Sequence, residues 1–403
     1  MRSPRPSVLA GALVALALGG IVLATRHTSA ALSSPLVPPG AWRTVFVVSA
    51  VVAIVGWLAA TMLVRRALPS LRLVLALAAV VQLLPLASPL LLSRDAYVYW
   101  DYARIATTHH ANPYSDLPSR FPDDPAYARM GSDWHRTYDA YGPLWTLTGE
   151  AETTYVGDSP KRAALAAKVV GAAGALFLVG AAAFAARRRA AAAAFLGWNP
   201  LIALHLAGGG HNEGWMMGFV LLGIGLTRRR RPVLGGAAWM AGVGVKWFPL
   251  LLLPLELRAL PRRVAKRVLI GLASAGVLGA ALATAVYGVD WLHAAAPISN
   301  QLRRGNSLGL VSDLERLGLS LHAATVVLGV LFAACYLVLL WKAKDGRPRL
   351  AFTAGLFSLS LAWLAPWYAI WSLAPAAVAD DDREGRVLAI VLSVYLFVDA
   401  IPR

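Results

Sequence analysis

Charged residues are scarce in this chain of 403 residues: Asp, Glu, Lys and Arg make up 15% of it, against 58% hydrophobic residues. The mean hydropathy is +0.59. A soluble protein needs far more charge to cover its surface, so the composition excludes an ordinary soluble domain. Acidic residues are the fewest, with 21 Asp and Glu against 38 Lys and Arg, which gives a formal net charge of +17.

Cysteine is almost absent as well. Cys335 is the single cysteine, so no intramolecular disulfide can form. The histidine-containing segment GGGHNEGW, residues 208–215, lacks the ligand spacing of a zinc site. We therefore predict no metal ion and no other cofactor.

Apolar runs of roughly 15 to 25 residues recur along the chain, and a helix of about 20 residues crosses the hydrocarbon core. The predicted fold is all-α: a polytopic transmembrane helical bundle, with residues 1–403 as one membrane domain of about 12–13 spanning or half-spanning helices. The first run follows Arg2 and Arg5 and is interpreted as a retained signal anchor. The predicted ranges are 8–25, 43–64, 71–92, 162–186, 190–206, 213–227, 232–245, 247–257, 268–288, 323–341, 350–365, 367–379 and 387–401.

Short basic clusters indicate the orientation. They all fall on one side if the N-terminus is cytoplasmic, and multi-pass proteins of the plasma membrane keep such clusters inside. Because the clusters are short, scattered and at helix ends, the positive charge is topological, and nucleic-acid binding is not predicted. The clusters are Arg65–Arg66, Arg187–Arg189, Arg228–Arg231, Arg258–Arg267 and Lys342–Arg349.

This orientation places most acidic residues on the extracytoplasmic face, together with two long loops, residues 93–161 and 289–322. Long loops in a compact protein are commonly functional. The first loop is predicted to hold a helical piece over about 95–110 and then turn-rich segments. We therefore expect the active site on the extracytoplasmic face, with residues 93–161 as the catalytic loop.

The segment 232–257 poses a topological problem, because one helix through it would put the next basic cluster on the wrong side. A break near Gly244, Lys246 and Pro249 resolves this, and such a break is tolerated where it lines a cavity. Lys246 would then lie at the extracytoplasmic mouth. The alternative is one long tilted helix from which Lys246 snorkels.

Several short motifs together resemble a known family. They are SRDAYVYWDYAR with NPY, YGPLW, WNPL, HNEGWMMGF, GVGVKWFPLLLLPL and LAPWYAIWSLAP, in this order from about residue 70 to 375. The chain resembles the C-superfamily (GT-C) membrane glycosyltransferases, particularly the bacterial polyprenol-phosphate-mannose-dependent α-1,6-mannosyltransferases of lipomannan. The resemblance implies a lipid-phosphate sugar donor, an envelope glycan or lipoglycan acceptor, and a catalytic Asp in the first large loop, which matches Asp95.

The chemistry also points to one carboxylate. A phosphate leaving group needs little protonation, so the enzyme must deprotonate the acceptor hydroxyl, and an inverting transfer needs a single base. Asp95, at the membrane edge after an apolar run, is the predicted base. Asp101 is the competing acid, or an ion-pair partner of Arg104. The pair Asp123–Asp124 is interpreted as a surface turn between prolines rather than a metal site.

The donor phosphate requires cations or directed donors. The predicted phosphate-binding residues are Lys246, Arg303, Arg304 and His211. Further residues predicted to bind substrate are Arg94, Asp101, Tyr141, Asn212 and Glu213. For each of them a solvated or purely structural role is the alternative.

Trp363, Trp367 and Trp371 recur every four residues around Pro366. We interpret them as an interfacial belt, with a wall for a prenyl chain or sugar as the alternative. A membrane transporter or lipid-linked sugar flippase is the rival function, and ionisable residues near mid-membrane would mark it. Lys168 is the main charged residue well inside a predicted span, whereas the acidic residues collect in loops on one face, so the enzyme is preferred.

Overall fold

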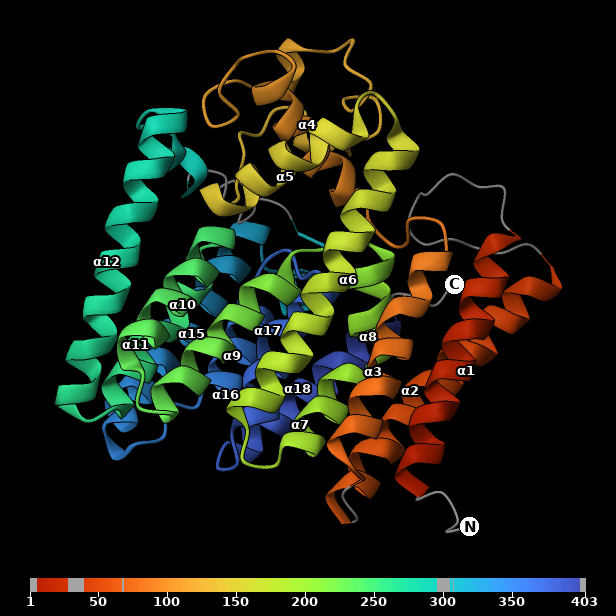
Figure 1. The fold of residues 1–403 in the computed structure, drawn as a ribbon, viewed down its shortest axis with the longest axis vertical. Coiled ribbons are helices and arrows are strands. Elements are labelled where there is room, and N and C mark those ends of the chain that lie inside the picture. Colours follow the sequence, from red (N-terminus) through yellow and green to blue (C-terminus); the bar gives the residue numbers. More distant parts are fainter. Residues whose placement is uncertain (1–5, 28–39, 67–68, 296–304, 307, 399–403) are drawn as a thin grey trace.

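The structure is a computed structural model, and it describes residues 6–27, 40–66, 69–295, 305–306 and 308–398. Within these ranges the chain forms helices and no strands, which confirms the predicted all-α fold. Figure 1 shows long helices side by side, with a smaller group of helices above one end of the bundle.

The helices fall into four successive groups. The N-terminal group is α1 (Pro6–Arg26), α2 (Ala41–Arg66), α3 (Leu71–Leu83) and the 3₁₀ turn η1 (Leu84–Ala87). The first loop holds α4 (Asp95–Thr107), η2 (Pro118–Arg120), η3 (Ser132–Trp134) and α5 (Pro143–Val156). The central group is α6 (Pro160–Ala185), α7 (Arg189–Gly197), α8 (Pro200–Ala203), the π-helix η4 (Leu204–Gly208), α9 (Glu213–Arg228), α10 (Pro232–Val245), α11 (Pro249–Ala259), α12 (Arg262–Tyr287) and η5 (Asp290–Ala295). The C-terminal group is α14 (Leu310–Arg316), α15 (Leu321–Lys342), η6 (Ala343–Asp345), α16 (Leu350–Ser360), η7 (Pro366–Tyr368), α17 (Ala369–Val378) and α18 (Arg383–Phe397).

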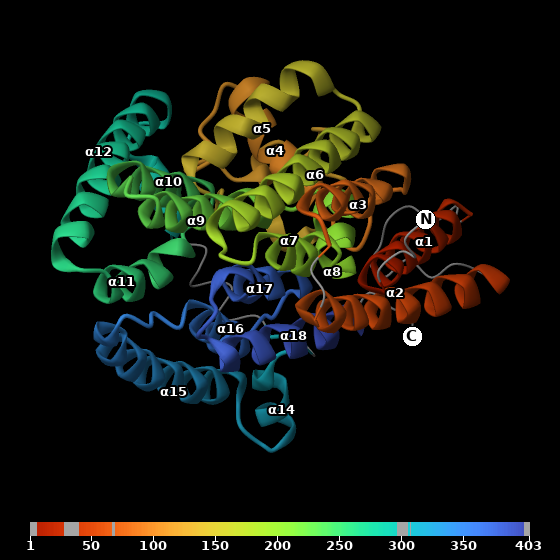
Figure 2. The same cartoon turned by 60° about the horizontal axis from the view of Figure 1, so that its bottom comes forward.

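Five helices of the described chain are long and apolar enough to cross a membrane, and a sixth span is possible if α7 and the helical segment Pro200–Gly208, bent by 57°, count as one. The five are Pro6–Arg26, Ala41–Val64, Pro160–Ala185, Arg262–Tyr287 and Leu321–Asp345. The helices α12 and α15 flank the bundle (Figure 2), and only 17% and 6% of their apolar windows are buried. Apolar side chains left exposed in this way suit contact with lipid.

Small residues let neighbouring helices approach closely. A Cβ atom at Gly236 of α10 would lie 1.9 Å from the carbonyl oxygen of Val268, and one at Gly271 of α12 would lie 1.8 Å from that of Val233. Glycine at both positions therefore permits backbone contact between α10 and α12, as is common between membrane helices.

Several predicted helices are shorter or more broken than expected. The predicted helix 71–92 ends at Leu83, because Pro85 and Pro89 cannot continue it. The predicted helix 190–206 is broken at Trp198 and Asn199, where the Asn199 side chain accepts hydrogen bonds from the first turn of α8. The predicted helix 350–365 ends at Ser360.

The first loop folds more fully than expected. The predicted helical piece over 95–110 is confirmed as α4, but α5 was not predicted in the turn-rich segment that follows. Gly142, just before α5, donates from its N–H to the carbonyl oxygen of Val245 at the end of α10 (3.1 Å). This bond fixes the loop over the bundle, where α4 and α5 lie in Figure 1.

Candidate active site

Asp95 begins α4, directly after the turn that follows η1. Its N–H donates to Ser93 Oγ (3.0 Å), and the N–H of Leu91 donates to the carbonyl oxygen of Gly208 (2.9 Å), which holds the turn against the end of η4. Asp95 is only 8% exposed. Burial raises the pKa of its carboxyl group to about 6, although the nearby Lys246 lowers it. A carboxylate with a raised pKa is a stronger base.

The turn before α9 and the first residue of α9 carry three buried polar side chains, of which His211 lies beside Asp95. The His211 Nδ1 atom lies 3.6 Å from Asp95 Oδ2, and the imidazole stacks on Trp367 with ring centroids 3.8 Å apart. Asn212 and Glu213 are completely buried. Both amide atoms of Asn212 and Glu213 Oε2 have no hydrogen-bond partner among the described residues. None of His211, Asn212 and Glu213 is among the residues that line the described cavities, so their predicted contacts with substrate stay predictions.

Lys246 lies in extended backbone between α10 and α11. The predicted helix break is therefore confirmed, and the alternative of one continuous helix is wrong. The ammonium donates to Glu213 Oε1 (2.7 Å) and lies 5.5–5.6 Å from the ring centroids of Tyr141, Tyr368 and Trp371. An ammonium has three donors, so Glu213 leaves capacity for an anion.

A cavity of about 230 Å³, which we call the lysine cavity, adjoins Lys246 and the three aromatic rings around it. Its walls are mostly aromatic, and both Asp95 and Lys246 face it. The lining residues are Asp95, Trp134, Ala140, Tyr141, Lys246, Trp247, Phe248, Leu251, Phe357, Leu361, Trp363, Trp367, Tyr368 and Trp371.

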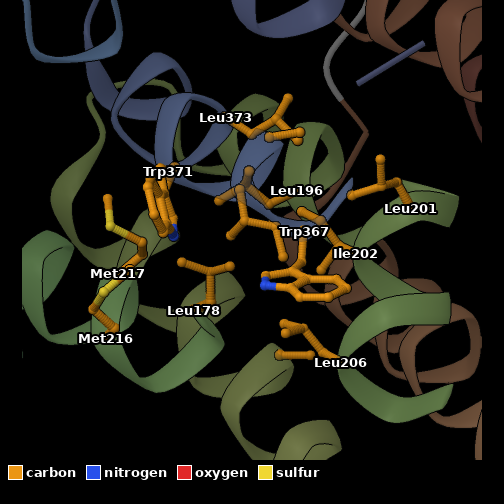
Figure 3. Close-up of a cluster of buried hydrophobic side chains, with 14 of the residues drawn as sticks. Leu178, Leu196, Leu201, Ile202, Leu206, Met216, Met217, Trp367, Trp371 and Leu373 are labelled. Atoms are coloured by element: carbon orange, nitrogen blue, oxygen red, sulfur yellow. The ribbon is translucent and has the colours of Figure 1, made fainter. Parts of the chain in front are cut away.

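The tryptophan stripe proves to be a cavity wall. Trp367 and Trp371 are 6% and 4% exposed, and Figure 3 shows both within the buried apolar cluster that includes Leu178 and Leu206. The interpretation as an interfacial belt is therefore wrong for these two residues. Both indole rings pack closely against neighbouring rings and form part of the wall of the lysine cavity.

The structure does not bring every predicted site residue to the cavity. Arg94 is exposed and lines no cavity described for this chain, and Asp101 is buried inside the first loop. Burial and the nearby Asp124 raise the pKa of Asp101 to about 7. Arg303 and Arg304 lie outside the described residues.

The acidic pair Asp123–Asp124 is tied into the loop. Asp124 accepts hydrogen bonds from Arg104 Nε (2.8 and 2.9 Å) and contacts His109 Nε2 (2.7 Å). Arg104 therefore pairs with Asp124, not with Asp101 as the sequence suggested, and it also binds Asp158. Among the described residues, no group of three or more His, Cys, Asp and Glu side chains is arranged to hold a metal ion.

Some residues at the site had no predicted role. Tyr368 and Trp134 line the lysine cavity, and His205 and Asn306 line the one beside it. His205 carried the only usable signal, since a histidine in an apolar run is costly unless it is functional. Tyr368, Trp134 and Asn306 gave no such signal, because aromatic and polar residues are common at the helix ends of membrane proteins.

Comparison with known proteins places this geometry in context. The family model "Alpha-(1->6)-mannopyranosyltransferase, N-terminal domain" matches residues 7–260, and "MptB C-terminal domain" matches residues 304–403. Alpha-(1->6)-mannopyranosyltransferase A of Mycobacterium tuberculosis is 27% identical over 353 residues, 77% of this chain and 67% of the relative.

Two relatives come from Corynebacterium glutamicum. Its alpha-(1->6)-mannopyranosyltransferase A is 31% identical over 172 residues, 42% of this chain and 34% of the relative. Its alpha-(1->6)-mannopyranosyltransferase B is 25% identical over 334 residues, 71% and 55% of the two chains. The chain thus matches about two thirds or less of the length of these relatives. No solved structure matches it.

Proposed function

Because the chain belongs to the alpha-(1->6)-mannopyranosyltransferase family, we propose that it transfers mannose from a polyprenyl-phosphate donor to an envelope glycan or lipoglycan. The family match confirms the predicted membrane mannosyltransferase. The lipid-linked donor, the acceptor, the inverting mechanism and the extracytoplasmic face are our proposals.

The observation that carries the mechanism is that Asp95 and Lys246 face one cavity. Asp95 takes the proton of the acceptor hydroxyl as that oxygen forms a bond to the anomeric carbon. The bond from this carbon to the phosphate oxygen breaks, and its electron pair leaves with the phosphate, whose negative charge Lys246 stabilises. Attack from the face opposite the leaving group inverts the anomeric centre.

For His211 we propose a role other than the predicted binding of the donor phosphate. It is fully buried, stacked on Trp367 and beside Asp95. We therefore assign it to orienting Asp95. Arg303 and Arg304 keep their proposed contact with the phosphate, alongside Lys246.

A larger apolar cavity supports a lipid-linked donor. It has a volume of about 400 Å³, lies between α5, α10 and α12, and shares Trp247 with the lysine cavity. Its α12 wall is formed by small side chains such as Ala275, Gly276 and Gly279. An apolar groove beside a phosphate-binding cation suits a prenyl phosphate, whose tail needs burial in apolar surroundings and whose head needs charge.

The test is a transfer assay with the purified protein. Polyprenyl-phosphate [¹⁴C]mannose should label a mannoside acceptor, whereas a nucleotide-linked mannose should not. Linkage analysis of the product should give an α-1,6 bond. Labelling from the nucleotide sugar alone would reject the lipid-linked donor, and absence of transfer from either donor would reject the activity.

A further inference from the structure

We propose that a second cavity, of about 270 Å³, binds the acceptor sugar, with His205 as its hydrogen-bonding residue. This inference rests on the proposed function, because it assigns the second substrate of the same reaction. Asp95 lines this acceptor cavity and the lysine cavity alike, together with Trp134, Trp363 and Trp367. A base that removes a proton from the acceptor must reach both substrates.

His205 is the polar group that requires a ligand. It is 1% exposed, it lies in the π-helix η4, and neither ring nitrogen has a hydrogen-bond partner among the described residues. An imidazole can donate from one nitrogen and accept at the other. Both of these needs match a sugar hydroxyl, which also donates and accepts.

The walls of the acceptor cavity suit a sugar ring. Trp134 and Trp363 are partly exposed there, and Trp363 packs edge-on against Trp367 with ring centroids 6.0 Å apart. The flat apolar face of an indole ring can cover the C–H face of a hexose while polar groups bind its hydroxyls.

Asn306 makes this wall rigid. Its Nδ2 donates to the carbonyl oxygen of Leu364 (2.8 Å), and its Oδ1 accepts from the N–H of Leu364 (3.1 Å). Both ends of the amide are thereby used to hold the segment that carries Trp363 and Trp367. A wall fixed in this way can select one orientation of a bound sugar.

Charge distinguishes the two cavities. Lys246 lines the lysine cavity and does not line the acceptor cavity. A phosphate needs a charged donor, but a neutral sugar does not. We therefore place the donor phosphate beside Lys246, which leaves the acceptor cavity for the acceptor sugar.

The test separates acceptor binding from donor binding. The donor is polyprenyl-phosphate [¹⁴C]mannose and the acceptor is octyl α-mannopyranoside, with the concentration of each varied in turn. His205→Phe and Trp363→Leu should each raise the acceptor KM by about tenfold to a hundredfold, since a hydrogen bond or a stacked ring is lost. In His205→Phe, the donor KM and the slow hydrolysis of donor by water should stay within about twofold of wild type, because His205 does not line the lysine cavity and the acceptor takes no part in either.

His205→Gln should recover part of the acceptor affinity, because the amide also donates and accepts. His322→Gln is the matched control, since His322 is exposed at the start of α15 and lines neither cavity. An unchanged acceptor KM in Trp363→Leu and in a folded His205→Phe, or a raised donor KM with an unchanged acceptor KM, would overturn the assignment. Failure of the wild-type protein to use this donor would instead reject the proposed function.

Discussion

Asp95 combines two properties that oppose each other in water: it is buried, and it must be ionised to act as a base. Burial disfavours the charged form, while Lys246 and the Ser93 hydroxyl favour it, and the pKa settles at about 6. The carboxylate is therefore ionised at neutral pH, yet more basic than an exposed Asp. This balance suits a group that takes a proton from an alcohol.

We expect Asp95→Asn to lower the turnover number by about 10² to 10⁴ while donor binding is retained, because the amide keeps the shape but cannot accept the proton. The measurement is transfer of labelled mannose at saturating donor, together with donor affinity. Asp101→Asn is the control, since Asp101 lies away from the cavity, and it should stay within about threefold of wild type. Loss of activity in Asp101→Asn alone would exchange the two roles.

The pH dependence should report the same carboxyl group. Its folded-state pKa is raised, so the proton is held more tightly than in an exposed Asp, and the active ionised form is lost as the pH falls through about 6. We expect kcat/KM to be constant above about pH 7 and to fall about tenfold per unit below pH 6. A profile that stays flat down to pH 5 would show that no carboxyl group of raised pKa takes part.

Lys246 should act on the donor. Lys246→Gln removes the charge that stabilises the leaving phosphate. We expect kcat/KM for the donor to fall, and the fall should correspond to a loss of about 2–4 kcal/mol of transition-state stabilisation. Acceptor affinity should be unchanged. Lys344→Gln is the matched control, because Lys344 is exposed on η6 and outside the cavity. Equal effects of the two substitutions would indicate a general effect of charge.

At the residue scale, the sequence predicted those site residues whose charge contrasts with apolar neighbours. Asp95, Lys246 and Glu213 stand out in this way, and the structure places them together. Trp134 and Tyr368 could not be predicted, because an aromatic residue near a membrane has many ordinary roles. Their positions depend on how the first loop folds over η7, and that packing joins segments far apart in the chain.

At the element scale, the site is built from interrupted helices. Asp95 follows the interruption after α3, and Lys246 lies in the interruption between α10 and α11. Each leaves backbone groups that need partners. After η1, Lys168 donates to the carbonyl oxygens of Leu86 and Ser88. Lys168 therefore has a structural partner, which removes the main sequence argument for a transporter.

The break at Lys246 was predictable because topology required it, whereas the breaks at Leu83 and Asn199 were not predicted. At both of these breaks the polar residues and prolines are few, and apolar residues resume directly after them. Hydropathy reports where apolar residues are, but not where the helix axis turns. The residues that indicate these two breaks are Pro85 and the Asn199–Pro200 pair.

Substitution of Gly142 tests the contact between the first loop and the break between α10 and α11. A Cβ atom there would lie 2.3 Å from the carbonyl oxygen of Gly244, so Gly142→Ala must displace either α5 or the end of α10. We expect turnover to fall at least about tenfold, since small displacements of catalytic groups are costly. Gly131→Ala is the matched control, because its nearest neighbour, in Trp134, would be 3.6 Å away. Full activity in Gly142→Ala would show that the junction does not position Lys246.

At the scale of the whole molecule, the two ends of the bundle differ. The group of α4 and α5 lies at one end, and the N-terminal end of α1 lies at the other (Figure 1). Basic clusters such as Arg228–Arg231 and Lys342–Arg349 join helices at positions that the positive-inside rule assigns to the cytoplasm. On that rule, we expect the cavity beneath α4 to open to the extracytoplasmic side.

Cysteine labelling in intact cells tests this orientation. In a Cys335→Ser background, Ser132→Cys on η3 should react with a membrane-impermeant maleimide, whereas Asp345→Cys on η6 should react only after permeabilisation. Both positions are exposed, so access to reagent should depend on the side of the membrane alone. The reverse pattern would place Asp95 and its cavity on the cytoplasmic face. The basic clusters in the short loops would then be outside, against the positive-inside rule. In that case the donor could be drawn from the inner leaflet, and the choice of acceptor would have to change with it.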